Sequence, residues 1–260
     1  MEKLRLKTER SEREKFYLSC ALSKNLEKEE KARFFGVEKL SCTLIYIRTE
    51  KRVLDLLEAI SQFLVGEVDK AVAIDQNSIL LFKFKDKTFS AYKSIKEFTE
   101  LLKQFCYEET GVEFSALIGK SVDSVLNARE SYSFILRAEK NCDNKLKDGG
   151  VYLAEEFSLN VLLNDMGYEK VAKIFPTLKA EKIQKLISNS ELLKTSETFI
   201  KCNLNACETA RVMFIHRNTL SYRLNKIESL TGLNLRIFSH SVVFSSILGF
   251  LKKEIEGESI

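Results

Sequence analysis

The pattern of hydrophobic residues changes near residue 153, and this change restricts the chain to two different kinds of fold. Before this point, short β-rich runs such as SCTLIYIRT at 41–49 alternate with segments of helical spacing. After it, the apolar residues follow helical spacing. Breaks in that spacing fall at Gly167, Pro176, Asn189, 203–205 and Gly232. A chain of 260 residues has room for two ordinary domains. We therefore predict a helical lead-in over 1–40, an α/β domain over 41–153 and a helical domain over 154–260.

The elements predicted within the α/β domain follow the order β-α-β-β-α-β-α. Strands are predicted at 41–49, 70–74, 78–84 and 113–119, and helices at 53–64, 95–109 and 122–140. Polar residues at 75–77 indicate a hairpin between the second and third strands. Ser94 is predicted to cap the helix at 95–109, and Gly111 is predicted to end it.

This order predicts an antiparallel or mixed four-stranded sheet with helices on one face, a ferredoxin-like arrangement in the α+β class. The polar segment NCDNKLKDGG at 141–150 has the composition of a linker. The short run VYLA that follows it can add a strand to the same sheet.

Positive charge is concentrated towards the C-terminus. The whole chain has a net charge of +4. Residues 201–236 contain six cations (Lys201, Arg211, Arg217, Arg223, Lys226 and Arg236) and two acids (Glu208 and Glu228), and 6 − 2 gives +4 for this segment alone. A local basic patch is what a phosphate backbone attracts, although chance unevenness is an alternative explanation.

Two helices joined by a tight turn are predicted inside this basic segment. The first covers 206–214 with Asn205 as its N-cap, and the second runs from Arg217 to about Thr231 and ends at Gly232. Leu220, Leu224 and Ile227 are spaced +4 and +3, so they lie on one face of the second helix, which we expect to be buried. Ala210, which is small, and Ile215, in the turn, are predicted to join the same core.

The opposite face of the second helix is rich in hydrogen-bonding groups and contains no acid. It carries Arg217, Asn218, Ser221, Tyr222 and Asn225. Such a face suits the major groove of DNA, and the positive end of the helix dipole favours phosphate. An ordinary helical hairpin with a solvated polar face is the alternative. The predicted DNA-binding residues are His216, Arg217, Asn218, Thr219, Ser221, Tyr222, Arg223 and Lys226. Of these, Arg223 and Lys226 are expected to contact phosphate, and His216 lies at the entry to the helix.

The segment ETARVMFIHRNTLSYRLNKIESLTGLN at 208–234 resembles the C-terminal helix-turn-helix signature of the CdaR/PucR family of bacterial transcription regulators. The family pattern is T-A-x-x-L-F-[VI]-H-R-N-T-L-x-Y-R-L-x-[RK]-I-x-x-L-T-G-L. Met213 replaces the usual leucine, and Lys226 keeps the basic position. The same helix pair is similar to the Fis-type helix-turn-helix. The resemblance implies a motif at about 205–232 in a non-enzymatic, homodimeric regulator that binds double-stranded DNA and controls small-molecule catabolism or transport genes.

Residues 41–140 resemble, more weakly, the middle domain of that family, a degenerate relative of the diguanylate cyclase (GGDEF) fold. A cyclase needs acids and glycines around its metal and nucleotide. The first strand here, LIYIRTE, contains no aspartate, and in the hairpin Asp75 is a lone acid without a Gly-Gly pair. We therefore expect a regulatory or dimerisation role for this domain rather than catalysis.

A third alternative is a protein that acts only as an interaction partner, dimerising with a sensor-bearing regulator. The 40 residues before the α/β domain are too few for the sensor domains that many family members carry. The sequence does not identify a small-molecule effector.

The remaining composition favours neither a metal site nor export. The six cysteines form no C-x-x-C pair, and His216 and His240 are the only histidines, so reduced thiols and no metal or cofactor are expected. No apolar run approaches the roughly 18 residues of a membrane span. The N-terminus lacks the apolar core of a signal peptide. We therefore expect a cytoplasmic protein.

Overall fold

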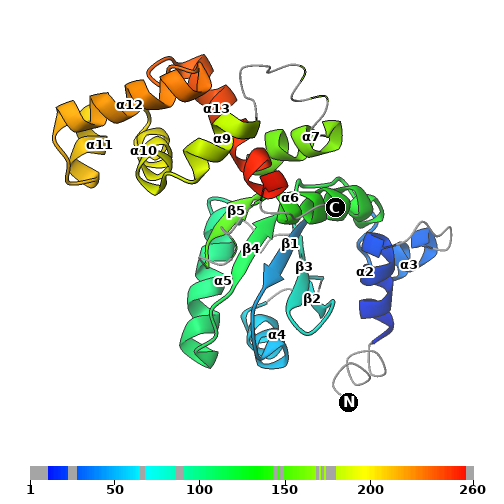
Figure 1. Ribbon diagram of the computed structural model, residues 1–260. Helices are drawn as coiled ribbons and strands as arrows, with labels where there is room; N and C mark the ends of the chain where they lie inside the picture. The colour runs from blue at the N-terminus through cyan, green and yellow to red at the C-terminus, as the bar shows by residue number, and fades with distance from the viewer. Residues whose placement is uncertain are drawn as a thin grey trace. The chain divides into compact units, whose positions relative to one another are not determined.

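The computed structural model divides the chain into two compact units, Met1–Ser158 and Leu159–Ile260. It describes residues 11–22, 28–64, 68–85, 91–142, 146, 149–167, 170, 173 and 180–255. Part of the predicted linker at 141–150 and the predicted break at Pro176 lie outside these residues. Each unit is described separately below (Figure 1).

The first unit contains a five-stranded mixed sheet. Its strands are β1 (Cys42–Arg48), β2 (Lys70–Ala73), β3 (Ser78–Phe84), β4 (Ser115–Ile118) and β5 (Val151–Leu153). They lie in the order β2-β3-β1-β4-β5, and only β5, which pairs with β4, is parallel to its neighbour. The first four strands and the helices between them confirm the ferredoxin-like arrangement, and the run VYL supplies the fifth strand.

Helices cover both faces of this sheet, so the prediction of helices on one face is wrong. On one face lie α4 (Val53–Phe63) and α5 (Ile95–Thr110) (Figure 1). Their side chains Leu56 and Leu102 belong to one buried core with Ile45 and Ile79 of the strands. On the other face lie α2 (Glu12–Leu22) and α6 (Ala128–Asn141), which follows a 3-10 turn, η2 (Val125–Asn127). The Tyr17 ring of α2 stacks on Phe82 of β3 at 5.2 Å. The Tyr46 hydroxyl of β1 donates to the Glu139 carboxylate of α6 at 3.0 Å.

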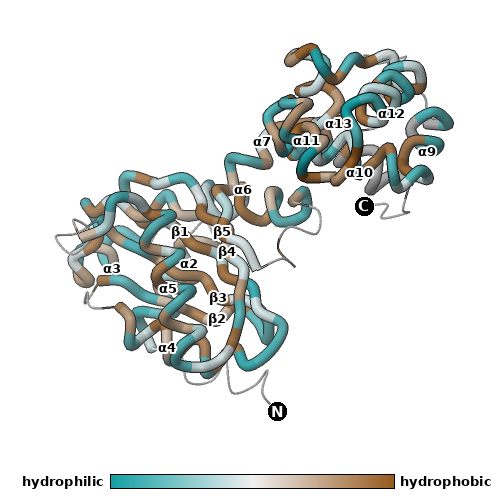
Figure 2. Tube along the Cα trace, turned by 90° about the vertical axis from the view of Figure 1, so that its left-hand side faces the viewer, coloured by the Kyte–Doolittle hydropathy of each residue, from teal (hydrophilic) through white to brown (hydrophobic). Residues whose placement is uncertain are grey.

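A second cover is needed because the strands are apolar on both sides. All seven residues of β3, SILLFKF, are buried. Figure 2 shows the hydrophobic residues running along the strands. A short helix, α3 (Lys28–Phe34), follows α2, so residues 12–34, predicted as a lead-in, belong to this unit.

Local signals determine where α5 begins and ends. The Ser94 hydroxyl accepts a hydrogen bond from the backbone N–H of Glu97 at 3.1 Å. Gly111 ends the helix in the left-handed conformation, with φ 67°. Both features confirm the predicted caps.

The second unit is helical in its described residues, apart from the turns between helices. The first unit ends with a 3-10 turn, η4 (Ala154–Phe157), and the chain continues directly into α7 (Ser158–Met166). Further helices are α9 (Ala180–Ile187), α10 (Ser190–Lys201), α11 (Ala206–Val212), α12 (Arg217–Thr231) and α13 (Phe238–Ile255). Their core includes Leu186, Phe199, Leu224 and Phe244. The predicted breaks at Gly167 and Asn189 coincide with the end of α7 and the N-cap of α10.

Candidate nucleic-acid interface

The basic segment forms two helices, α11 and α12, joined by residues 213–216. The side chain of Asn205 caps α11 by accepting from the backbone N–H of Glu208 at 3.0 Å. Ala210 of α11 is 9 % exposed, small enough to let α12 approach closely, and belongs to the core of the helical unit. The start of α11 therefore follows from the short polar residue at 205.

The turn between the two helices contains an unusual backbone conformation. Phe214 has φ 53°, in the left-handed region. Its N–H donates to the carbonyl of Arg211 at 3.2 Å, and the N–H of Ile215 donates to that of Ala210 at 3.0 Å. These two bonds form a Schellman motif, in which a left-handed residue reverses the chain after a helix. Ile215 is half-buried against the core, as predicted.

His216 begins α12 as its N-cap. Its Nδ1 atom accepts from the backbone N–H of Asn218 at 3.2 Å. The imidazole therefore satisfies one of the free N–H groups at the start of the helix. The sequence placed His216 at the helix entry but did not assign it this capping role.

The inner face of α12 is buried as its spacing predicts. Leu220, Leu224 and Ile227 are at most 2 % exposed and lie in the core of the helical unit. The helix ends at Gly232, which has φ 75°. The buried leucines hold α12 against α10 and α11, so the outer face is presented on a rigid support.

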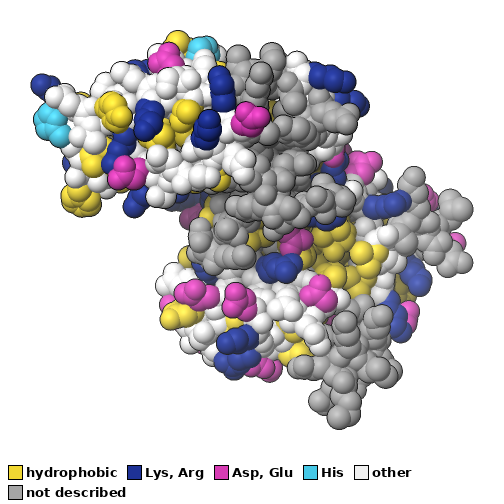
Figure 3. All heavy atoms as spheres, in the orientation of Figure 1, with side chains coloured by type: hydrophobic (Ala, Val, Ile, Leu, Met, Phe, Trp, Pro, Cys, Tyr) yellow, Lys and Arg dark blue, Asp and Glu magenta, His cyan; other side chains and the backbone are white. Residues whose placement is uncertain are grey.

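The outer face of α12 is exposed and free of acid in its first half. Its exposed side chains among the predicted residues are His216, Arg217, Asn218, Thr219, Ser221, Tyr222 and Lys226. The helical unit is rich in Lys and Arg on the face shown in Figure 3. The structure thus brings seven of the eight predicted side chains to one solvent-facing surface.

Arg223 is the exception, because its guanidinium turns back to α10. Its Nη2 atom lies 3.1 Å from the carboxylate of Glu191, and its Nη1 atom donates to the hydroxyl of Thr195 at 3.5 Å. The side chain is only 16 % exposed. In this structure Arg223 links α10 to α12, and its predicted phosphate contact stays a prediction.

Arg236 is a residue of the outer face that the sequence pattern missed. It follows Gly232, outside the helix, yet its guanidinium donates to Asn225 Oδ1 and to Ser221 Oγ, both at 3.0 Å. The only signal for it in the sequence was its positive charge within 201–236. Its link to α12 depends on the chain reversal after Gly232, which spacing alone does not give.

The cations of this segment are not equally available to a ligand. Arg211 forms two hydrogen bonds with Glu208, at 2.7 and 3.1 Å, and these lower the pKa of the Glu208 carboxyl. Arg223 is paired as described above. Among the residues that the structure describes, Lys201, Arg217, Lys226 and Arg236 are exposed and form no ion pair. These four carry the positive charge that an anionic partner would meet.

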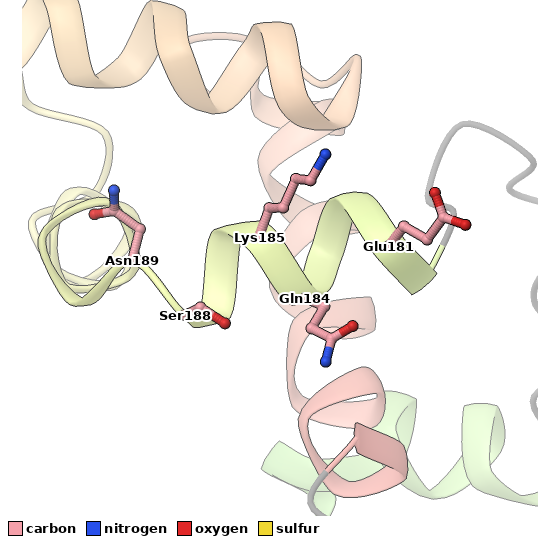
Figure 4. Close-up of a pocket in the computed structure, with 5 residues that line it drawn as sticks. All are labelled: Glu181, Gln184, Lys185, Ser188 and Asn189. Atoms are coloured by element: carbon pink, nitrogen blue, oxygen red, sulfur yellow. The ribbon is translucent and has the colours of Figure 1, made fainter.

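Other surfaces of the described residues offer little chemistry. The hollow beside α9 is lined by polar side chains of Glu181, Gln184, Lys185, Ser188 and Asn189, which point in different directions (Figure 4). No group of three potential metal ligands occurs within the described residues. Over the same residues, no helix has the length and apolar character needed to cross a membrane.

Comparison with known proteins agrees with this geometry. Residues 192–246 match the model of the PucR C-terminal helix-turn-helix domain. The proline-responsive transcriptional activator PutR of Bacillus subtilis is 26% identical over 196 residues, which cover 71% of this chain and 46% of PutR. The carbohydrate diacid regulator of Escherichia coli is 33% identical over 98 residues, covering 36% of this chain and 24% of that protein.

Two further proteins are similar to parts or most of this chain. The purine catabolism regulatory protein of Bacillus subtilis is 31% identical over 75 residues, covering 29% of this chain and 14% of that protein. A crystal structure of a regulator of polyketide synthase expression from Bifidobacterium adolescentis covers 93% of this chain and 98% of its own, with 14% identity and a TM-score of 0.41. The chain spans less than half the length of the three curated relatives named here.

Proposed function

We propose that this chain, whose residues 192–246 match the PucR C-terminal helix-turn-helix domain, is a regulator of the CdaR/PucR type that binds specific sites on double-stranded DNA and controls their transcription. The observation that carries this proposal is the acid-free, exposed first half of α12, held in place by a buried face of Leu220, Leu224 and Ile227. A helix presented in this way fits the major groove. The regulated genes are proposed to serve small-molecule catabolism or transport, as the names of the relatives suggest.

The residues of the outer face are assigned to two kinds of contact, with base edges and with phosphates. Base-edge contacts are assigned to Arg217, Asn218, Thr219, Ser221 and Tyr222, on the first half of α12. Lys226 and Arg236, both exposed and without acidic partners among the described residues, are assigned to phosphates. His216 caps α12, and the dipole of α12 assists anion binding at this end of the helix. Arg223 positions α12 against α10.

The proposed regulator is a homodimer that acts in the cytoplasm on bacterial DNA. A two-fold symmetric protein suits operators built from two half-sites. The α/β unit is proposed to supply dimerisation or regulation, and no catalytic role is proposed for it. Sedimentation of the full chain, alone and with DNA, tests the dimer, and a monomer in both states would contradict it.

The proposal is tested by selecting bound fragments from genomic DNA at a stated salt concentration. We expect one family of sites to be enriched. Arg217→Ala should weaken binding to the selected duplex by about 1–3 kcal/mol and relax the sequence preference at one position. The matched control is Arg129→Ala, which removes the same charge from an exposed site on α6.

Two results would contradict the proposal. Equal effects of Arg217→Ala and Arg129→Ala would mean that α12 does not read the base pairs. No enrichment over random fragments would favour the alternative role, an interaction partner of a sensor-bearing regulator.

A further inference from the structure

Phe214, in the turn before α12, combines two unfavourable features. Its side chain is 96 % exposed, and its backbone has φ 53°. An exposed hydrophobic residue is ordinary by itself. A bulky residue in the left-handed region is rare, because its Cβ crowds the backbone there.

After four other helices the left-handed position is held by a residue that tolerates it: Gly111 after α5, Gly167 after α7, Gly232 after α12 and Asn203 after α10. Leu204, which follows Asn203, also has a positive φ, 61°, but its side chain is half-buried and packs against the core of the helical unit. Glycine and asparagine are the residues that tolerate this position. A glycine is also frequent in the turn of helix-turn-helix motifs. Phe214 differs from these residues, because it is neither a residue that tolerates a positive φ nor one that packs against the core.

Among the described residues, side-chain packing does not offset these features. With the ring almost fully exposed, Phe214 gains little from packing. Strained residues of this kind are concentrated at functional sites, where a partner or reaction makes use of them. The side chain is therefore best explained by a contact that forms in a complex.

The neighbourhood of Phe214 favours DNA as that partner. It lies two residues before His216, the N-cap of α12, and the side chains of Arg211 and Arg217 on either side in the sequence are exposed. A protein partner would call for a larger apolar patch, whereas the neighbouring exposed side chains are one apolar residue, Val212, and the polar and basic residues that begin α12. Thymine methyl groups and deoxyribose offer DNA's apolar surface beside the groove.

We propose that Phe214 contacts DNA, with its ring against a thymine methyl group or a deoxyribose beside the groove that α12 enters. This inference rests on the proposed DNA-binding function. The left-handed backbone at 214 then serves to direct an aromatic ring towards the duplex, at the expense of stability in the free protein.

The test separates the ring from the backbone strain by three substitutions in the full chain. Phe214→Gly and Phe214→Asn both remove the ring and tolerate a positive φ. Phe214→Tyr keeps the ring and the strain. The probe is the duplex recovered by genomic selection, and binding and thermal unfolding are both measured.

Phe214→Gly and Phe214→Asn should raise the unfolding midpoint of the helical unit by a few degrees and weaken DNA binding by about tenfold or more. The dependence of binding on salt should not change, because no phosphate contact is lost. Phe214→Tyr should behave like the wild type in both measurements. Replacing thymine by uracil in the duplex removes the methyl groups. If the ring contacts a methyl group, this replacement should weaken binding of the wild type but not of Phe214→Asn. If the ring contacts deoxyribose, the replacement should affect both proteins equally.

Wild-type affinity in both Phe214→Gly and Phe214→Asn would overturn this inference and leave the proposed function intact. If Phe214→Gly loses more DNA affinity than Phe214→Asn, the additional loss comes from a more flexible turn. The affinity of Phe214→Asn therefore decides whether the ring contacts DNA. Failure of the wild type to bind the selected duplex would remove both proposals.

Discussion

Two cations on α12, three residues apart, have opposite surroundings. Lys226 is exposed and unpaired among the described residues, whereas Arg223 is held between Glu191 and Thr195. Lys226→Ala should therefore weaken binding to all DNA sequences alike and reduce the slope of log affinity against log salt by about one, since one phosphate contact is lost. Arg223→Ala should instead lower the free energy of unfolding by about 1 kcal/mol, through lost packing and a partly exposed ion pair.

Urea unfolding and salt-dependent binding, measured on the same two variants, check this contrast. Glu191→Gln is the matched control, because it breaks the same ion pair from α10 and leaves every charge of α12 in place. If Arg223→Ala reduces the slope of log affinity against log salt and leaves the free energy of unfolding unchanged, Arg223 contacts a phosphate instead.

Single residues also show where sequence reasoning succeeds. Asn205, Ser94 and Gly232 were predictable because a cap acts on backbone groups two to four residues away. Arg223 and Arg236 were not, because their partners belong to other segments and depend on how the helices pack. The buried ion pair of Lys83 and Asp69, at 2.6 Å inside the sheet unit, is a similar case.

At the scale of elements, the close approach of β4 and α6 rests on Gly119. A Cβ atom there would lie 2.4 Å from Ser131 Oγ and 2.7 Å from Ile135 Cδ1, both on α6. Gly119→Ala should therefore push α6 from the sheet and destabilise the unit by about 1–3 kcal/mol. Urea unfolding measures the change, with Lys120→Ala, an exposed neighbour, as control. Equal urea midpoints for the two variants would contradict this prediction, because they would show that α6 can shift to accommodate the Cβ atom without a loss of stability.

The prediction of elements failed in one respect that the sequence had signalled. The runs LIYI and ILLF in β1 and β3 are apolar at every position rather than at alternate ones. Such runs are typical of strands buried on both faces. The helices at 12–22 and 128–141 supply the second cover. To assign these helices to the second face, one must know on which side of the sheet the chain passes between successive strands. The spacing of apolar residues does not give this.

At the scale of the whole molecule, the cysteines report separately on the two units. Cys20, Cys42, Cys106 and Cys142 are buried in the first unit, whereas Cys202 is half-buried and Cys207 exposed in the second. Burial raises the pKa of Cys20 to about 11 and that of Cys106 to about 12. Their reactive thiolate form is therefore scarce in the folded protein at pH 8.

A thiol reagent at pH 8 should modify Cys207 promptly and Cys202 more slowly. The other four thiols should react only as urea unfolds the α/β unit, so the modified fraction measures the stability of that unit alone. Cys207→Ser should remove the fastest phase. A single rate for all six cysteines would contradict the burial of the first four.

The polypeptide leaves the sheet through its shortest strand, β5, a three-residue edge strand. Just beyond it, the Phe157 ring lies 6.1 Å from that of Tyr152 and is buried. We expect a pulling force applied to the chain beyond β5 to reach the sheet through this strand. Its three residues give it few ladder hydrogen bonds, so β5 should detach before the longer strands do.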